Sequence, residues 1–98
     1  MKEKEILPLG SVVYLKEGTA KIMVIGRGVI FEQDGHDVYT DYCGVLVPTG
    51  FDADNGIFFN TDDVDKVVFK GYSDEDEKRF QTVYREWEES VDIPKAKI

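Results

Sequence analysis

The chain has 98 residues, 42% of them apolar, and a formal net charge of −8 at pH 7. This length predicts a single domain with a modest core, and the composition is that of a folded chain. The negative charge repels phosphate backbones and anionic lipid headgroups, which argues against nucleic acid as a partner.

The region from Ile6 to Tyr72 predicts strands and turns, because its apolar residues come in short runs broken by glycine. A first strand is expected in SVVYLKEG (11–18). The second apolar run, AKIMVIGRGVIFEQDG (20–35), is typical of a central strand. Gly26 and Gly28 are predicted to bend this strand.

Turn signals divide the middle of the chain. Asp34 and Gly35 predict a hairpin turn. The following segment, HDVYTDYCGVLVP (36–48), fits either a pair of strands or one long bent strand. The remaining predicted elements are the loop PTGFDADNG (48–56), the short strand GIFF (56–59), the capped turn NTDDVD (60–65) and the last strand KVVFKGY (66–72).

The segment SDEDEKRFQTVYREWEES (73–90) predicts an amphipathic helix. Four apolar residues recur at helical spacing and are expected to face the core: Phe80, Val83, Tyr84 and Trp87. Ser73 is the predicted N-cap, with Asp76 completing a capping-box pair. We expect a flexible tail over residues 91–98.

Together these elements predict an α+β fold in a single domain over residues 1–98, strand-rich over 6–72. We expect a curled antiparallel sheet, or a small barrel-like meander, of about five strands with one C-terminal amphipathic helix packed on it.

Cys43, the only cysteine, is the first candidate for a catalytic residue. A catalytic thiol needs a base that lowers its pKa, and the only histidine, His36, lies on a predicted polar turn. The acidic neighbours Asp37 and Asp41 favour the protonated thiol. Cys43 is therefore interpreted as a half-buried strand residue, and a lone cysteine also agrees with a reducing compartment.

Other chemical motifs fail on their context. The GRG at position 26 lacks the third glycine of a dinucleotide fingerprint, and DADNG at position 52 lacks the spacing of a calcium loop. The acids in the predicted first helical turn point around the axis, and no two carboxylates are placed in contrasting environments. We therefore predict no catalytic, cofactor or metal site, and expect a protein that is not an enzyme.

Surface chemistry and location complete the expectations. Tyr42, Phe51 and Tyr72 flank predicted turns and are expected to be partly exposed, as interface aromatics often are. The acid-rich stretch 73–92 is either a solvated face or a surface that attracts a basic partner. An exposed edge strand would allow a homo-oligomer. No run is long enough to cross a membrane and the start MKEKEILPLG does not look like a signal peptide, so we expect a cytoplasmic protein without membrane insertion.

Three stretches, followed by Trp87, resemble a known family. They are ILPLGSVVYLKEGTAKIMVIGR (6–27), DYCGVLVPTGF (41–51) and FNTDDVDKVVFKGYSDEDEKRF (59–80). They are similar to small cytoplasmic proteins of Gram-positive bacteria, a family described as a domain of unknown function and encoded beside type VII secretion genes and LXG-domain toxins. The positions that match the family pattern are Pro8, Leu9, Gly10, Ser11, Gly26, Arg27, Asp41, Tyr42, Gly44, Pro48, Gly50, Phe59, Asn60, Gly71 and Tyr72.

The resemblance implies an accessory role, in which the protein binds a cognate LXG effector before export as a chaperone or adaptor does. The open alternatives are an immunity protein that blocks a toxin domain and a regulator of unknown ligand. Many members of the family that the chain resembles carry a valine or similar small residue in place of Cys43, which argues against thiol chemistry. The expected partner-binding residues are Asp41, Tyr42, Pro48, Phe51, Tyr72, Asp74 and Glu75.

Overall fold

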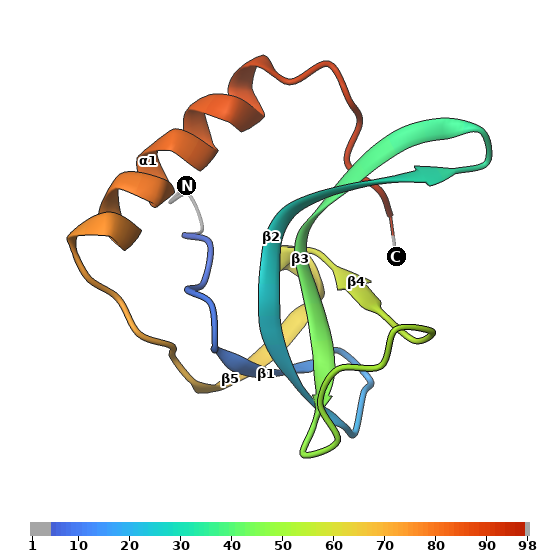
Figure 1. Cartoon of the computed structure of the whole chain (residues 1–98), viewed down its shortest axis with the longest axis vertical. Coiled ribbons are helices and arrows are strands. Elements are labelled where there is room, and N and C mark those ends of the chain that lie inside the picture. Colours follow the sequence, from blue (N-terminus) through green and yellow to red (C-terminus); the bar gives the residue numbers. More distant parts are fainter. Residues whose placement is uncertain (1–4, 98) are drawn as a thin grey trace.

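A computed structural model describes residues 5–97 and places one helix beside an antiparallel sheet (Figure 1). The predicted α+β fold is confirmed. The elements are β1 (Val12–Leu15), β2 (Lys21–Gln33), β3 (His36–Val47), β4 (Ile57–Phe59), the 3₁₀ helix η1 (Thr61–Asp63), β5 (Val64–Phe69) and α1 (Glu75–Ser90).

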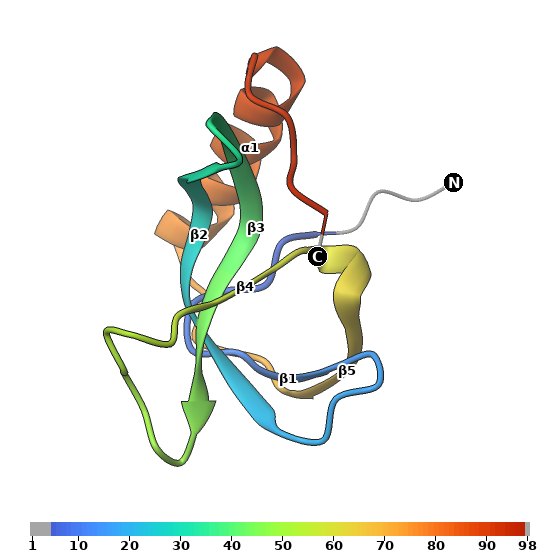
Figure 2. The same cartoon turned by 90° about the vertical axis from the view of Figure 1, so that its right-hand side faces the viewer.

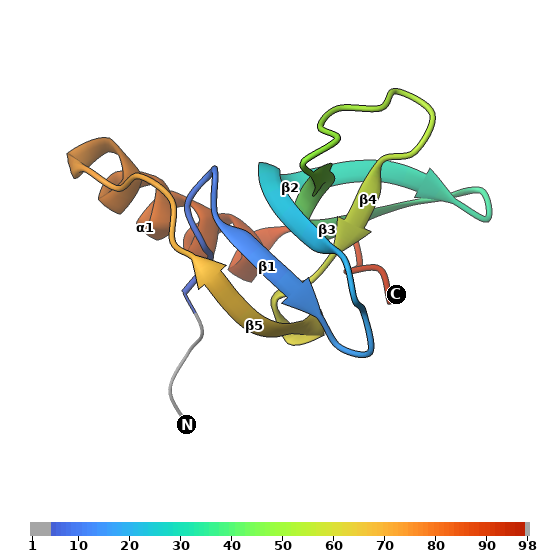
Figure 3. The same ribbon diagram turned by 90° about the horizontal axis from the view of Figure 1, so that it is seen from below.

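The sheet is open, with strand order β4-β3-β2-β1-β5. The five described strands lie side by side in Figure 3, where β4 and β5 form the two edges. Figure 2 shows the curl of the sheet, with β1 and β5 running across the base of the long β2–β3 hairpin. The curled antiparallel sheet is thus confirmed, whereas the barrel-like alternative is wrong because β5 pairs with β1 and not with β4.

The β2–β3 hairpin is the longest pairing in the sheet and settles the choice left open for residues 36–48. They form one long strand, β3, which pairs with β2 from one end to the other. Asp34 and Gly35 have φ values of 54° and 82°, the left-handed conformations that a tight hairpin turn requires. The register shifts between Val24 and Gly26, so the bend predicted at the glycines is present.

The core lies between the sheet and α1. Its buried members are Ile6, Val13, Ile22, Val24, Tyr42, Phe59 and Tyr84. From the helix, Phe80 and Trp87 pack against this cluster, as the helical spacing predicted. Val83, in contrast, is 59% exposed and does not belong to the buried face.

Gly28 allows the helix to approach the sheet closely. Its φ is +59°, and a Cβ atom at this position would lie 2.7 Å from Cε1 of Tyr84. Any side chain would therefore be strained by the backbone and would also push Tyr84 away. Gly28 thus sets the distance between β2 and α1.

The segment after α1 runs back along the sheet. The amide of Tyr39 donates to the carbonyl of Pro94, and the amide of Ala96 donates to the carbonyl of Tyr39. This parallel bridge continues the β4 edge, and Ala96 is only 5% exposed. The expectation of a flexible tail over 91–98 therefore differs from the structure over residues 94–96, which are docked; Ile98 lies outside the described residues.

Candidate functional site

The start of α1 is set by Asp74. Its side chain accepts a hydrogen bond from the amide of Glu77, and its backbone is extended as an N-cap requires. The prediction of Ser73 as N-cap is therefore wrong by one residue. Aspartate caps as well as serine does, so both choices were compatible with the sequence.

A groove lies between the β5–α1 connection and the first turns of the helix. We call it the Tyr72 groove; it measures about 380 Å³ and is lined by Leu9, Arg27, Tyr72, Asp74, Asp76, Glu77 and Phe80. Gly71 allows the β5–α1 connection to pack closely against the backbone of Leu9, because a Cβ atom at position 71 would lie 2.1 Å from the carbonyl oxygen of Leu9. The amide of Gly71 also donates to Oγ of Ser11.

The floor of the Tyr72 groove is a buried ion pair. Arg27 and Glu77 approach to 2.5 Å, and their side chains are only 8% and 10% exposed. The guanidinium carbon of Arg27 also lies 3.9 Å from the ring centroid of Phe80, a cation–π contact. Gln81 donates to Glu77, so the acid has a second partner. The charge of Arg27 is thus neutralised inside the protein.

The walls and rim are apolar and acidic. Tyr72 is 79% exposed and Leu9 is 48% exposed, although both are large apolar side chains. The four charged lining residues carry a formal sum of −2. Asp76 pairs with Arg79, but both side chains are exposed at the surface, where such a pair is weak. The groove therefore presents an aromatic ring next to a lining of net negative charge.

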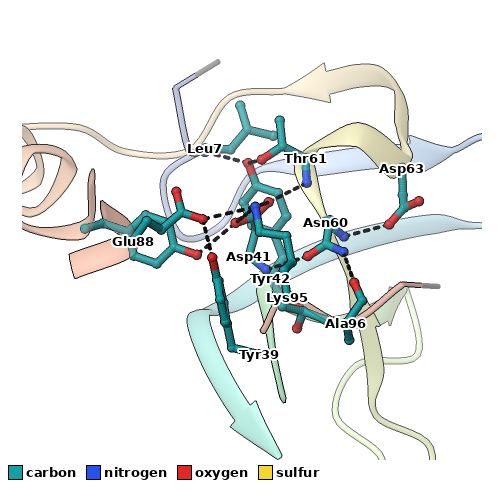
Figure 4. A network of polar contacts seen from close by, with 12 residues as sticks. Leu7, Tyr39, Asp41, Tyr42, Asn60, Thr61, Asp63, Glu88, Lys95 and Ala96 are labelled. Carbon is teal, nitrogen blue, oxygen red and sulfur yellow. Dashed lines mark hydrogen bonds and ion pairs between the residues drawn. The ribbon is translucent and has the colours of Figure 1, made fainter. Parts of the chain in front are cut away.

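A second cluster of polar side chains surrounds the buried carboxylate of Asp41 and reaches the surface at Lys95 and Glu88 (Figure 4). Asp41 accepts hydrogen bonds from the hydroxyl of Tyr84 at 2.8 Å and from the amide of Thr61 at 2.9 Å. Lys95 lies 3.1 Å from the same carboxylate and 3.0 Å from Glu88. We call these residues, with Tyr39, the Asp41 network; it connects β3, η1, α1 and the C-terminal segment.

The environment of the Asp41 network shifts several pKa values. Burial and the hydrogen bond to Glu88 raise the pKa of Tyr39 to about 12. Burial and the charge of Asp41 raise the pKa of Tyr84. Burial alone would lower the pKa of Lys95, but its contacts with Glu88 and Asp41 outweigh this and raise it. The network therefore keeps both tyrosines protonated and Lys95 charged, which suits a structural connection.

A third polar contact set supports η1. The side chain of Asn60 accepts a hydrogen bond from the backbone amide of Asp41 and donates one to the carbonyl of Ala96. The backbone amide of Asn60 donates to the carboxylate of Asp63. The hydroxyl of Tyr42 accepts from the amide of Leu7. The capped turn predicted at residues 60–65 is confirmed by this arrangement.

The predicted partner-binding residues divide into buried and exposed groups. Tyr42 is fully buried and Asp41 is 3% exposed, so the expectation that Tyr42 is partly exposed is wrong. A large aromatic ring opposite Phe59 on a central strand fills the core instead. Phe51 is 76% exposed, as predicted, and the loop that carries it and Pro48 lies away from α1 in all three views (Figures 1–3).

The structure thus groups Tyr72 and Asp74 in one groove. Glu75 is exposed in the first turn of the same helix. Asp41 and Tyr42 are buried and stabilise the fold. Pro48 and Phe51 belong to a separate loop.

Cys43 and His36 do not meet. They lie on the same strand, seven residues apart, which is roughly 23 Å in an extended chain. Cys43 is half-buried, as predicted, and burial raises the pKa of its thiol. Among residues 5–97 no group of histidine, cysteine and acidic side chains is arranged to hold a metal ion. Within the same residues, no helix combines the length and apolar character needed to cross a bilayer.

Sequence reasoning missed Arg27 and Lys95 as structural cations. Arg27 interrupts an apolar run, VIGRGVIF, and a charged residue in such a run needs a buried partner. That signal could have pointed to an acid on the helix. Nothing near Lys95 in the sequence indicates its contact with Asp41, because 54 residues separate them.

Comparison with family models places residues 6–80 in a family described as a domain of unknown function (DUF4176). The chain belongs to this family. The matched region contains the whole sheet and the Tyr72 groove, whereas three members of the Asp41 network, Tyr84, Glu88 and Lys95, lie beyond it. Comparisons with curated proteins and with solved structures find no match for the DUF4176 chain.

Proposed function

We propose that this protein is a noncatalytic accessory factor that binds another protein, and that its partner is an LXG-type effector of a type VII secretion system. In this role it acts in the cytoplasm as a chaperone or adaptor before export. The observation that carries the binding function is the Tyr72 groove, in which an exposed aromatic side chain stands beside an acidic rim. The resemblance to proteins encoded beside LXG toxins supports the choice of partner.

The Tyr72 groove has the chemistry of an interface centre. Tyrosine is enriched at interface hot spots, and a 79% exposed tyrosine gains much by being covered. Leu9 extends the apolar surface, and the acidic rim gives electrostatic complementarity to a basic partner and speeds its association. The buried Arg27–Glu77 pair holds the floor of the groove in one arrangement before binding.

Co-expression with an LXG protein encoded next to this chain tests the proposal, with affinity purification through the effector. We expect the wild-type chain to be retained and Tyr72→Ala to bind at least about tenfold more weakly, as loss of a hot-spot residue does. Phe51→Ala is the matched control, because Phe51 is equally exposed but lies outside the groove. An effector that never retains the wild-type chain would contradict the proposal.

The same experiment distinguishes a chaperone from an immunity protein. A chaperone or adaptor that acts before export is expected to be retained by the LXG portion of the effector expressed alone. An immunity protein is instead expected to bind the isolated toxic domain and to protect cells that express it. Retention by the toxic domain only would replace the chaperone assignment with the immunity alternative.

A further inference from the structure

The Tyr72 groove also has features that define the chemistry of the segment that enters it. We propose that it accepts a lysine or arginine side chain, flanked by apolar residues, from an extended segment of the partner protein. This inference rests on the proposed protein-binding function and adds the nature of the bound segment. The inference about the bound segment can fail while the proposed protein-binding function still holds.

The first argument is the balance of charge. The lining contains one cation and three acids, and the cation, Arg27, is already paired with Glu77 in the floor. Of the other two lining acids, Asp74 has no cation among the lining residues, and Asp76 pairs with Arg79 only at the exposed surface, where such a pair is weak. The whole chain carries −8. A positive side chain of a partner is therefore attracted both by the rim and by the wider field of the protein.

The second argument is the position of the aromatic and apolar groups. Tyr72 stands with one polar tip and a large ring exposed, and a guanidinium or ammonium group binds well over such a ring. The methylene groups of the entering side chain would cover Leu9, which is 48% exposed. Arg27 against Phe80 is an internal example of the same contact in the same groove.

The third argument is the exposed apolar surface next to the groove. β5 is an edge strand, and Val67, Val68 and Phe69 on it are 45%, 47% and 60% exposed. Lys70 and Gly71 connect the end of β5 at Phe69 to Tyr72, and Figure 3 shows β5 continuing into the connection to α1. A segment that fills the groove can therefore continue along β5. Apolar residues beside the basic residue of the partner would cover them.

Two other occupants fit less well. An anion is disfavoured because the formal charge of the lining residues is −2. In addition, the backbone amide of Glu77 at the helix start already donates to the carboxylate of Asp74. A second copy of the chain is disfavoured because each copy carries −8 and would bring the same acidic rim toward its partner. A basic segment of another protein meets neither objection.

The test uses the full ¹⁵N-labelled chain and synthetic peptides followed by amide chemical shifts in NMR titrations. The probes are nine-residue peptides of glycine, serine, valine and leucine that differ only at the central residue. The central residue is arginine, the uncharged arginine isostere citrulline, or glutamate. We expect shifts around Gly71, Tyr72 and the first turn of α1, with affinity for the arginine peptide about three to five times that for the citrulline peptide.

A pair of double variants separates local charge from net charge. Asp74→Ser with Asp76→Asn removes both rim carboxylates, and serine keeps the helix cap. Glu89→Gln with Asp92→Asn removes the same charge from exposed positions outside the groove. We expect the preference for arginine over citrulline to disappear in the first variant and to remain in the second, with unchanged melting temperatures confirming the fold of both.

Equal affinity for the arginine and citrulline peptides overturns the inference, as does a preference that survives removal of the rim carboxylates. Concentration-dependent shifts of the same amides without peptide also overturn it, because they would assign the groove to a second copy. Retention by the effector is a separate readout and decides only the proposed function.

Discussion

Asp41 is expected to be the most sensitive polar residue of the scaffold, and Asp41→Asn tests this. The aspartate carboxylate, 4% exposed, accepts bonds from Tyr84, Thr61 and Lys95. In the asparagine variant one oxygen still accepts, but the amide nitrogen faces a donor and the charge opposite Lys95 is lost. A lost hydrogen bond to a charged group costs about 1.5–3 kcal/mol, so we expect a free energy of unfolding lower by about 3 kcal/mol.

Urea denaturation followed by Trp87 fluorescence measures this change. Trp87 is the only tryptophan, and its ring centroid lies 4.8 Å from that of Tyr39 and 5.6 Å from that of Tyr84. Asp92→Asn, at an exposed position, is the control and should change stability by no more than about 0.5 kcal/mol.

A double-mutant cycle with Tyr84→Phe then tests whether the effect passes through the network. Tyr84→Phe removes the 2.8 Å hydrogen bond and Asp41→Asn removes the negative charge of its acceptor, so their combined effect should be smaller than their sum by about 1 kcal/mol. Additive effects within about 0.3 kcal/mol, or a cost of Asp41→Asn below about 1 kcal/mol, would refute the reasoning.

Three further predictions concern pH, glycine and the helix cap. Because the pKa of Tyr39 rises from 10.0 to about 12 on folding, the contribution of its protonated hydroxyl to stability is complete below pH 10 and is lost toward pH 12. Urea titrations should therefore give a lower free energy of unfolding at about pH 11.5 than at about pH 9, and Tyr39→Phe should make this difference smaller. Gly28→Ala should cost at least about 2 kcal/mol, whereas Gly35→Ala, also left-handed but without neighbours within 4 Å, should cost about 1 kcal/mol; equal costs by the same assay would contradict the close approach to the helix. Asp74→Ala should lower the free energy of unfolding by about 1 kcal/mol and Ser73→Ala by much less, and the reverse order would restore Ser73 as the cap.

Local chemistry explains which elements could be predicted. The Asp34–Gly35 turn requires two left-handed residues, and that preference is carried by the residues themselves. The helix could be predicted from the spacing of Phe80, Tyr84 and Trp87, because that spacing places the three side chains on one helical face regardless of which element the helix packs against. The helix cap was displaced by one residue because two adjacent residues are both good caps.

The candidate site was predicted only in part. Tyr72 and Asp74 were selected because they flank a turn and begin a helix, and the structure brings them into one groove. Tyr42 was selected for the same kind of reason but is buried, since the alternation of a strand does not say which face the helix will cover.

The sequence by itself determined the α+β class, the turns and the amphipathic helix, because these depend on interactions between residues close along the chain. Only the tertiary structure decided that the sheet stays open, that Asp41 meets Lys95, and that Arg27 is neutralised by Glu77 beneath an acidic, aromatic groove. Those contacts join residues about 50 positions apart, Arg27 to Glu77 and Asp41 to Lys95. Their partners are selected by packing of β5, α1 and the C-terminal segment on the sheet, which no local pattern encodes.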